Sequence, residues 1–209
     1  DDVMIILGDA GFNYYGGWRD EHQKKRMAKQ PITILAIHGN HEMRPETLPS
    51  YKEQPWCGGT VYVEDAYPNL LFAKDGEVYD LDGKQALVIG GAYSVDKYYR
   101  LSRGWGWGAD EQPSPEIKAR VEASIEQMGW KVDIVLSHTT PLKYEPVEVF
   151  LPDIDQSKVD KSTEEWLDSI EERLDYKKWY CSHYHTEKKI DRLQIMFNDY
   201  AALEADCLC

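Results

Sequence analysis

The chain has 209 residues, of which 42% are hydrophobic and 29% charged, and its formal net charge is -13. This length and composition predict a single globular domain over residues 1–209 with a short tail from about residue 203, and no apolar run is long enough to span a bilayer. The acidic balance argues against broad binding to nucleic-acid backbones, which depends on lysine and arginine. We therefore expect neither a membrane protein nor a general nucleic-acid binder.

The four cysteines show no C-x-x-C pair and no regular framework, which favours a reducing compartment over a secreted disulfide scaffold. They are Cys57, Cys181, Cys207 and Cys209. We therefore expect a cytoplasmic protein, in which the last two cysteines belong to a frayed tail rather than to a metal knuckle.

The first third of the chain predicts a strand, helix, strand unit followed by a long loop. Val3 to Leu7 and Ile32 to Ile37 are apolar runs typical of buried strands. The polar segment from Gly17 to Gln30 between them predicts an exposed helix. The prolines and paired glycines from Arg44 to Gly59 predict a loop without regular structure.

Short strands dominate the next segment, from Thr60 to Gly91. The expected strands are Val61 to Val63, Leu70 to Ala73, Val78 to Tyr79 and Ala86 to Ile89. Asp75-Gly76 and Asp82-Gly83 are tight-turn signals between them. A meander or a second sheet is the expected result.

Two helices and three further strands are expected in the second half. Ser114-Pro115 provides an N-cap and a first-turn proline for a helix that ends at Gly129. Its buried stripe is Ile117, Val121, Ile125 and Met128, and it leads into a strand from Val132 to Leu136. Pro141 to Lys161 predicts a loop, and Ser162-Thr163-Glu164-Glu165 resembles a capping box at the start of a helix with Trp166, Leu167, Ile170 and Leu174 on its apolar face. The final strands are expected at Trp179 to Ser182 and Leu193 to Phe197.

Histidines gather at the ends of these predicted strands. Five of the six follow a strand directly, and they are His38, His41, His138, His183 and His185. Any one alone would be interpreted as a core or capping residue. Together with Asp9 and Asn40, which also follow strands, they provide the oxygen and nitrogen donors that suit Zn, Mn or Fe, at the edge where ligands bind in open α/β sheets.

The spacing of His183 and His185 suits two neighbouring metal ions, because alternate side chains of an extended segment project to one side. Asp9 could bridge two such cations, which would share and acidify an attacking water. His41, beside Asn40, is the candidate proton donor to a departing oxygen.

Four ordered motifs carry a resemblance to a known family. They are Gly8-Asp9, Gly39-Asn40-His41-Glu42, Ser137-His138 and Ser182-His183-Tyr184-His185. In this order and spacing they resemble the motifs of the calcineurin-like metallophosphoesterases, over most of the chain. The resemblance implies an α/β fold, a four-layer sandwich of two mixed β-sheets flanked by helices, with a binuclear metal centre at the strand ends.

The same resemblance implies a role for each site residue. Asp9 is the implied bridging ligand, and Asn40, His138 and His183 are the implied ligands of one metal. His185 belongs to the other metal, and His41 is the implied leaving-group acid. The ions are two divalent metals, with Mn, Fe, Zn and Ni all open.

Two features depart from the family pattern. Ser182 stands where the last motif usually has glycine, a small change. The Asp-x-His motif that opens the family pattern is not found before Asp9. Either the first strand is missing from this sequence or the second metal is held weakly, and we favour the first interpretation because losing that strand would open the middle of a sheet.

The segment Gly90 to Arg100 resembles one in bacterial and phage members of the family, of the serine/threonine phosphatase-like kind. Arg100 and Arg103 are candidate substrate-binding residues, since guanidinium groups match phosphate oxygens, although pairing with surface acids is an equal alternative. Trp105 and Trp107 could wall a substrate pocket, but packing within a glycine-rich loop is the favoured interpretation.

The leading hypothesis is a hydrolase, a metal-dependent phosphatase or phosphodiesterase that cleaves a phosphate mono- or diester with a metal-activated hydroxide. A phosphorylated small molecule, nucleotide or phosphoprotein is the expected partner. The alternative is a non-catalytic phosphate- or partner-binding module with an incomplete metal site, and a nuclease of the same family is disfavoured by the acidic balance.

Overall fold

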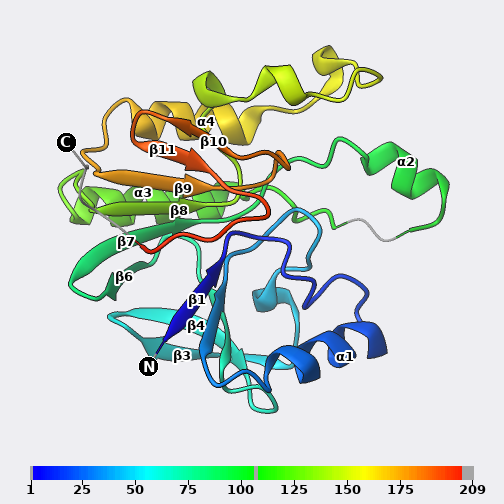
Figure 1. Cartoon of the computed structure of the whole chain (residues 1–209), viewed down its shortest axis with the longest axis vertical. Helices are drawn as coiled ribbons and strands as arrows, with labels where there is room; N and C mark the ends of the chain where they lie inside the picture. Colours follow the sequence, from blue (N-terminus) through cyan, green and yellow to red (C-terminus); the bar gives the residue numbers. More distant parts are fainter. Residues whose placement is uncertain (1, 106–107, 204–209) are drawn as a thin grey trace.

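Two mixed β-sheets face each other, and helices cover their outer surfaces, in a computed structural model that describes residues 2–105 and 108–203 (Figure 1). The first sheet has the order β1 (Val3–Ile6), β2 (Thr33–Ala36), β5 (Leu70–Ala73), β4 (Gly59–Glu64), β3 (Tyr51–Trp56). The second has the order β10 (Lys188–Ile190), β11 (Leu193–Ile195), β9 (Lys178–Cys181), β8 (Ile134–Ser137), β7 (Lys84–Ile89), β6 (Val78–Leu81). Each sheet combines parallel and antiparallel pairs, so the expected pair of mixed sheets flanked by helices is confirmed.

The helices divide between the two outer faces. The α-helices are α1 (Trp18–Met27), α2 (Lys97–Ser102), α3 (Pro115–Gln127) and α4 (Ser162–Glu171), and the short 3-10 helices are η1 (Pro45–Thr47), η2 (Leu142–Tyr144), η3 (Val147–Val149) and η4 (Gln156–Lys158). α1 lies on the first sheet, α3 and α4 lie on the second, and α2 lies to one side (Figure 1). None of the helices in the described segments is long and apolar enough to cross a membrane.

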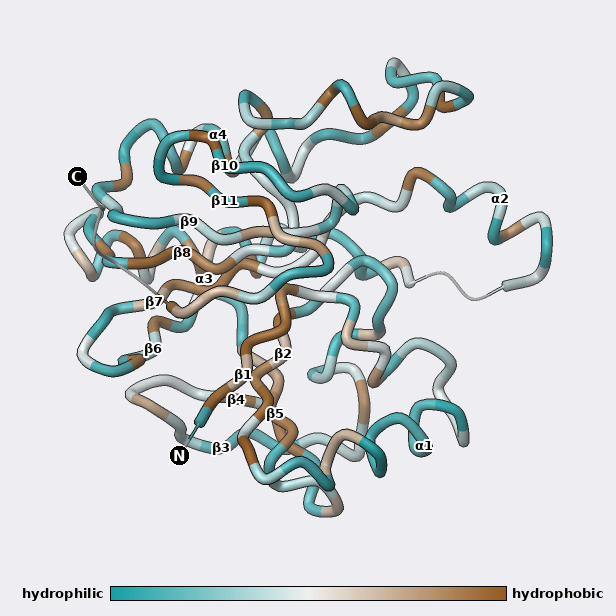
Figure 2. Tube along the Cα trace, viewed as in Figure 1, coloured by the Kyte–Doolittle hydropathy of each residue, from teal (hydrophilic) through white to brown (hydrophobic). Residues whose placement is uncertain are grey.

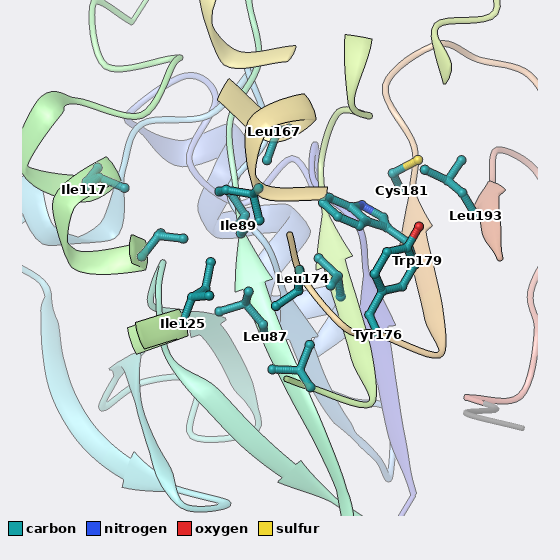
Figure 3. Close-up of a cluster of buried hydrophobic side chains, with 14 of the residues drawn as sticks. Leu87, Ile89, Ile117, Ile125, Leu167, Leu174, Tyr176, Trp179, Cys181 and Leu193 are labelled. Carbon is teal, nitrogen blue, oxygen red and sulfur yellow. The ribbon is translucent and has the colours of Figure 1, made fainter. Parts of the chain in front are cut away.

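The alternation of side chains along the strands produces three apolar layers. Leu35 of β2 and Val88 of β7, both fully buried, belong to the cluster between the sheets. Their chain neighbours Ile34 and Leu87 belong to the outer clusters, one beneath α1 and one against α3 and α4 (Figure 3). Central strands such as β5 and β8 are apolar along the chain trace, whereas α1 is mainly hydrophilic (Figure 2). Four layers of secondary structure therefore enclose three buried interfaces.

Several local predictions are confirmed. The Ser114 side chain caps α3 by accepting the Ile117 N–H at 3.3 Å, and the expected stripe is buried except for the half-buried Met128. Asp82 and Gly83 both have positive φ, at 55° and 76°, which is the conformation that a two-residue type I′ hairpin requires between β6 and β7.

Three predictions are wrong or incomplete. Tyr51–Trp56, expected within a loop, is an edge strand paired with β4; it tolerates Pro55 because an edge strand can leave a ladder donor unused. Because its side chains are mostly exposed, this strand lacks the alternation of apolar residues from which a strand is predicted. The short β10 was also missed.

The capping box at Ser162 does not form either. Lys161 is the residue before α4 and makes no side-chain cap, whereas the Ser162 N–H donates to the Asp160 carboxylate at 3.0 Å. Glu165, the acid that this capping box would use, is exposed, and its neighbour Glu164 turns inward and accepts the Thr139 hydroxyl at 2.8 Å. The predictions for Trp107, Cys207 and Cys209 fall outside the described residues.

Candidate metal centre

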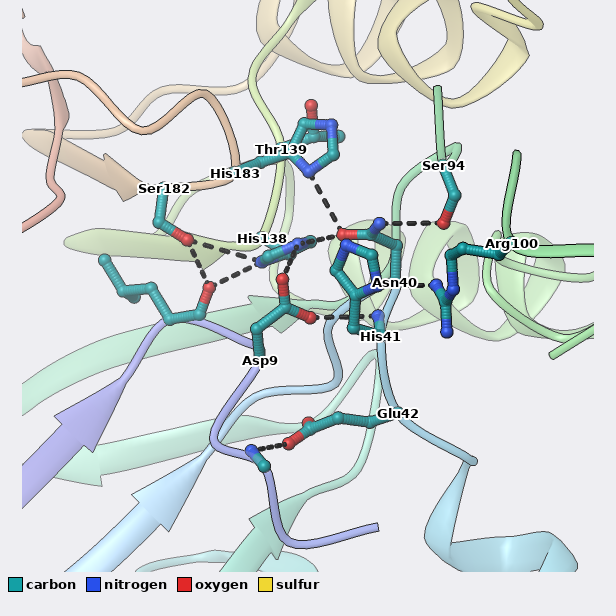
Figure 4. A network of polar contacts seen from close by, with 12 residues as sticks. Asp9, Asn40, His41, Glu42, Ser94, Arg100, His138, Thr139, Ser182 and His183 are labelled. Atoms are coloured by element: carbon teal, nitrogen blue, oxygen red, sulfur yellow. Dashed lines mark hydrogen bonds and ion pairs between the residues drawn. The ribbon is translucent and has the colours of Figure 1, made fainter. Parts of the chain in front are cut away.

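Loops from both sheets meet where the parallel strands end. Asp9 and Asn40 follow β1 and β2 of the first sheet, and His138 and His183 follow β8 and β9 of the second. The four side chains point toward one another in Figure 4. The topology therefore brings together residues that are up to 174 positions apart in the chain.

The carbonyl oxygen of Leu7 connects the two sheets at this point. It accepts the His138 Nδ1–H at 2.7 Å and the Ser182 hydroxyl at 2.5 Å. Because a carbonyl can only accept, the proton of neutral His138 lies on Nδ1 and Nε2 carries a free lone pair. Ser182, which departs from the family pattern, therefore adds a hydrogen bond that glycine could not make.

The free donor atoms converge around Asn40. Its Oδ1 lies 2.8 Å from His138 Nε2 and 3.1 Å from His183 Nδ1, and Asp9 Oδ2 lies 3.6 Å from His138 Nε2. Ligands bound to one ion at about 2.1 Å are separated by roughly 3.0–3.4 Å, so these spacings resemble the edges of a coordination shell. The Nε2 lone pair of neutral His138 and the Asn40 oxygen face each other at 2.8 Å, which favours a cation between them.

The chemistry of the set fits a divalent metal: a carboxylate, an amide oxygen and two imidazole nitrogens. Among residues 2–105 and 108–203, His, Cys, Asp and Glu side chains alone form no group of three that could hold an ion; the Asn40 amide oxygen is the atom that both His138 and His183 approach. The Asn40 Nδ2 donates to Ser94 Oγ at 2.8 Å, which turns Oδ1 toward the histidines. Ser94 lies within the segment Gly90 to Arg100, and no motif in the sequence indicates this role.

Left-handed backbone conformations orient the side chains of three candidate ligands. Asp9, His183 and His185 have positive φ values of 56°, 68° and 50°, a left-handed conformation that non-glycine residues seldom adopt. Two neighbouring glycines make room for it: a Cβ on Gly8 would lie 2.0 Å from His138 Nδ1, and one on Gly39 would lie 2.1 Å from Asp9 Oδ1. The glycines of the first two motifs are therefore needed for the close approach of the ligands.

Electrostatics keep the donors in the forms that bind cations. Burial alone would raise the pKa of Asp9, but His138, His41 and the His41 backbone N–H, which donates to Oδ1 at 2.9 Å, hold that pKa below its usual value. Burial, with help from His138, lowers the pKa of His183 to about 3. At neutral pH Asp9 is an anion and His183 is neutral, as metal ligation requires.

His41 faces an arginine. Its Nδ1 lies 2.5 Å from the Arg100 Nη1, and Arg100 is 3% exposed. Because guanidinium only donates, Nδ1 is the acceptor and the proton of neutral His41 lies on Nε2. Burial and the Arg100 charge lower the pKa of His41, against the opposing effect of Asp9.

Glu42 holds the two loops of the first sheet together. Its Oε1 accepts the backbone N–H of Gly11 at 2.6 Å and of Phe12 at 3.3 Å, so it joins the loop after Asp9 to the loop after Asn40. Burial, reinforced by the Asp9 carboxylate, raises the pKa of Glu42 to about 8.

Two predicted site residues lie outside the hydrogen-bonded group. The His185 ring stacks on Phe197 with centroids 4.9 Å apart, although His185 lines the same pocket as Asp9 and His183. Arg103 is exposed and lies over the Tyr99 ring at 5.3 Å. The structure thus brings Arg100, but not Arg103, to the site.

Comparison with known proteins agrees with this geometry. The sequence model of one family, described as calcineurin-like phosphoesterase, matches residues 1–189. Among curated proteins, none matches the chain. The family match spans all four motifs and the strands that precede them.

Proposed function

The chain belongs to the calcineurin-like phosphoesterase family of metal-dependent phosphate-ester hydrolases, and we propose that it is an active member in which Asp9, Asn40, His138 and His183 hold a catalytic divalent ion. The observation that supports this proposal most is the convergence of His138 Nε2 and His183 Nδ1 on the Asn40 amide oxygen. Neutral His138 donates its Nδ1–H to Leu7 and so directs the Nε2 lone pair at the Asn40 oxygen, and a cation between the two atoms satisfies both.

A second divalent ion, as is typical of the family, would use Asp9 as a shared ligand and His185 from the pocket wall. The chemistry that such ions supply when bound is stabilisation of the phosphoryl oxygens and activation of an attacking water. The protein holds the ligands through the Leu7 carbonyl, Ser94 and the left-handed residues described above, so little rearrangement is needed on binding.

His41 completes the proposed reaction as the proton donor to the leaving alkoxide. It lines the pocket beside Asp9 and Asn40, and the Arg100 contact to Nδ1 leaves the proton on Nε2. The Nε2–H in that position can hydrogen-bond to the departing oxygen and give it the proton as the phosphorus–oxygen bond breaks, after which the ring regains a proton from water. Arg100 therefore acts on His41 in this proposal, in place of the direct phosphate contact expected from the sequence.

The test is His41→Ala, assayed with Mn²⁺ on two monoesters that differ in leaving group, p-nitrophenyl phosphate and an alkyl phosphate. We expect kcat to fall by about 10²–10⁴ on the alkyl ester, which needs a proton, and much less on p-nitrophenyl phosphate, which does not. Metal content, measured by plasma mass spectrometry, should stay unchanged. The exposed His22→Ala is the matched control.

Equal losses on both esters would show that His41 positions the site and does not donate a proton. Wild-type protein that binds metal but hydrolyses neither ester would refute the enzyme and leave a binding module.

A further inference from the structure

The pocket above the candidate metal centre has an apolar wall. The pocket measures about 370 Å³ and includes Asp9, Asn40 and His183. Its other lining residues include five apolar side chains from the loop between β8 and α4, namely Val149, Phe150, Leu151, Ile154 and Val159. This loop was expected from the sequence to be irregular, and nothing in its pattern indicated that it would face the site.

An aromatic pair connects this wall to the ligands. The rings of Phe150 and Tyr184 stack at 6.0 Å with an interplanar angle of 17°. Tyr184 lies between His183 and His185 in the chain, and its ring meets the His183 ring edge-on at 5.0 Å. The apolar wall therefore begins directly beside a proposed metal ligand.

The wall is left partly exposed to water. Leu151 is 60% exposed and Val149 is 41% exposed, although both line the pocket. Exposed apolar surface of this kind is covered favourably by an apolar group. A ligand that extends from the metal centre along Phe150 would supply that cover.

The charged residues of the pocket lining restrict further which ligands the pocket can bind. Besides Asp9, the described lining residues include the acids Asp96, Glu145 and Glu164 and contain no lysine or arginine. The Lys161 ammonium, 2.7 Å from the Glu145 carboxylate, is engaged in that ion pair. A second phosphate that extended along the wall would find no lysine or arginine among the described lining residues.

From this combination, and resting on the function proposed above, we propose that the pocket selects small-molecule esters of a single phosphate whose alcohol part is apolar or aromatic. The volume is at the lower end of the range for small-molecule sites, which fits an alcohol the size of one ring with its linker. A lining that contains acids and no lysine or arginine disfavours nucleoside di- and triphosphates.

The experiment compares 2-phenylethyl phosphate with glycerol 3-phosphate, since both are monoesters of primary alcohols and differ little in intrinsic reactivity. We expect kcat/KM to be at least about tenfold higher for 2-phenylethyl phosphate, because burying even one small apolar group of a substrate can raise kcat/KM by this factor. ADP should be turned over least. Equal values for the two monoesters, or a preference for ADP, would overturn the proposal.

Substitutions in the apolar wall test whether this wall causes the selectivity between the two esters. Phe150→Ser should lower the ratio of the two kcat/KM values by about tenfold, and Leu151→Ser, at a position that is 60% exposed, should lower it in the same direction. Val147→Ser is the matched control, because Val147 lies in the same loop, is 66% exposed and is not part of the pocket lining. An unchanged ratio in both wall variants would refute the assignment.

Calorimetry separates this inference from the proposed function. Non-hydrolysable 2-phenylethylphosphonate should bind Mn²⁺-loaded protein more tightly than methylphosphonate, with a more negative heat-capacity change that Phe150→Ser reduces. If neither ester is hydrolysed but this binding difference is found, the proposed function fails and the pocket assignment stands. If both esters are hydrolysed and the phosphonates bind alike, the pocket assignment fails alone.

Discussion

Burial of Glu164 predicts that Glu164→Gln stabilises the protein increasingly as the pH rises. The side chain lies in the pocket wall and is 4% exposed. Burial raises its pKa to about 7, although the Thr139 hydroxyl donates to Oε1 at 2.8 Å and lowers that pKa in part. Glutamine keeps an oxygen acceptor for Thr139 and removes the ionisation.

The sign follows from proton binding. Between the ordinary pKa of 4.5 and the folded-state pKa of about 7, the folded protein keeps a proton that the unfolded chain has lost. Stability therefore falls as the pH rises through this window, and the loss is complete above about pH 8. A rise from 4.5 to about 7 corresponds to about 3 kcal/mol, a cost that the glutamine variant does not have.

The assay is urea unfolding of wild type and Glu164→Gln at pH 4.5, 6 and 8, with chelator present so that metal binding does not contribute. The difference in free energy of unfolding between the two proteins should shift by about 3 kcal/mol in favour of the variant from pH 4.5 to pH 8. Glu165→Gln, exposed on the same helix, is the control and should show no such shift. A difference that does not change with pH would show that Glu164 is ionised in the folded protein at neutral pH.

Two further substitutions test the site and the fold. Gly39→Ala should abolish tight metal binding and hydrolysis, measured by metal content and turnover, because the added Cβ would lie 2.1 Å from Asp9 Oδ1. Lys24→Met should lower the free energy of unfolding by about 3–5 kcal/mol in urea titration, since it leaves the buried Glu64 carboxylate without the ammonium that lies 2.6 Å away.

Each of these substitutions has a control in the same part of the chain. A Cβ at Gly17 meets nothing within 4 Å, so Gly17→Ala should bind metal normally. Lys25, the exposed neighbour of Lys24, should tolerate methionine with little loss. Normal metal binding by Gly39→Ala would mean that the loop moves to accommodate the added Cβ. A small decrease in the free energy of unfolding of Lys24→Met would mean that the Glu64 carboxylate is hydrated in the variant.

The elements that could be predicted from the sequence are those in which apolar residues repeat with the period of a strand or a helix. β2 and β7 alternate between two apolar interfaces, and the apolar stripe of α3 repeats at helical spacing, so local pattern and tertiary environment agree. β3 has almost no buried side chain, so its strand character comes from pairing with β4, which no local pattern reports. The capping box failed because α4 begins with Ser162 itself, so Ser162 is not the N-cap, and the Asp160 carboxylate accepts its backbone N–H.

The candidate ligands could be predicted because each directly follows a strand, but their partners could not. The contact between Arg100 and His41 joins residues 59 positions apart, and the contact between Leu7 and Ser182 joins residues 175 apart. Both depend on how the two sheets pack, which the chain order alone does not specify. The chemistry of Arg100 made it a candidate for phosphate binding, with pairing to surface acids as an equal alternative, and neither indicated its contact with His41.

The left-handed conformations of Asp9, His183 and His185 show what the fold contributes to this site. Each costs roughly 1–2 kcal/mol in a non-glycine residue, together about 3–6 kcal/mol, a large share of the stability of an ordinary domain. Glycine at any of the three would relieve the strain but would remove a proposed ligand. Local preference therefore opposes this geometry, and the packing of two sheets, tied through the Leu7 carbonyl, maintains it. Metal affinity should consequently depend on the core between the sheets as well as on the ligands themselves.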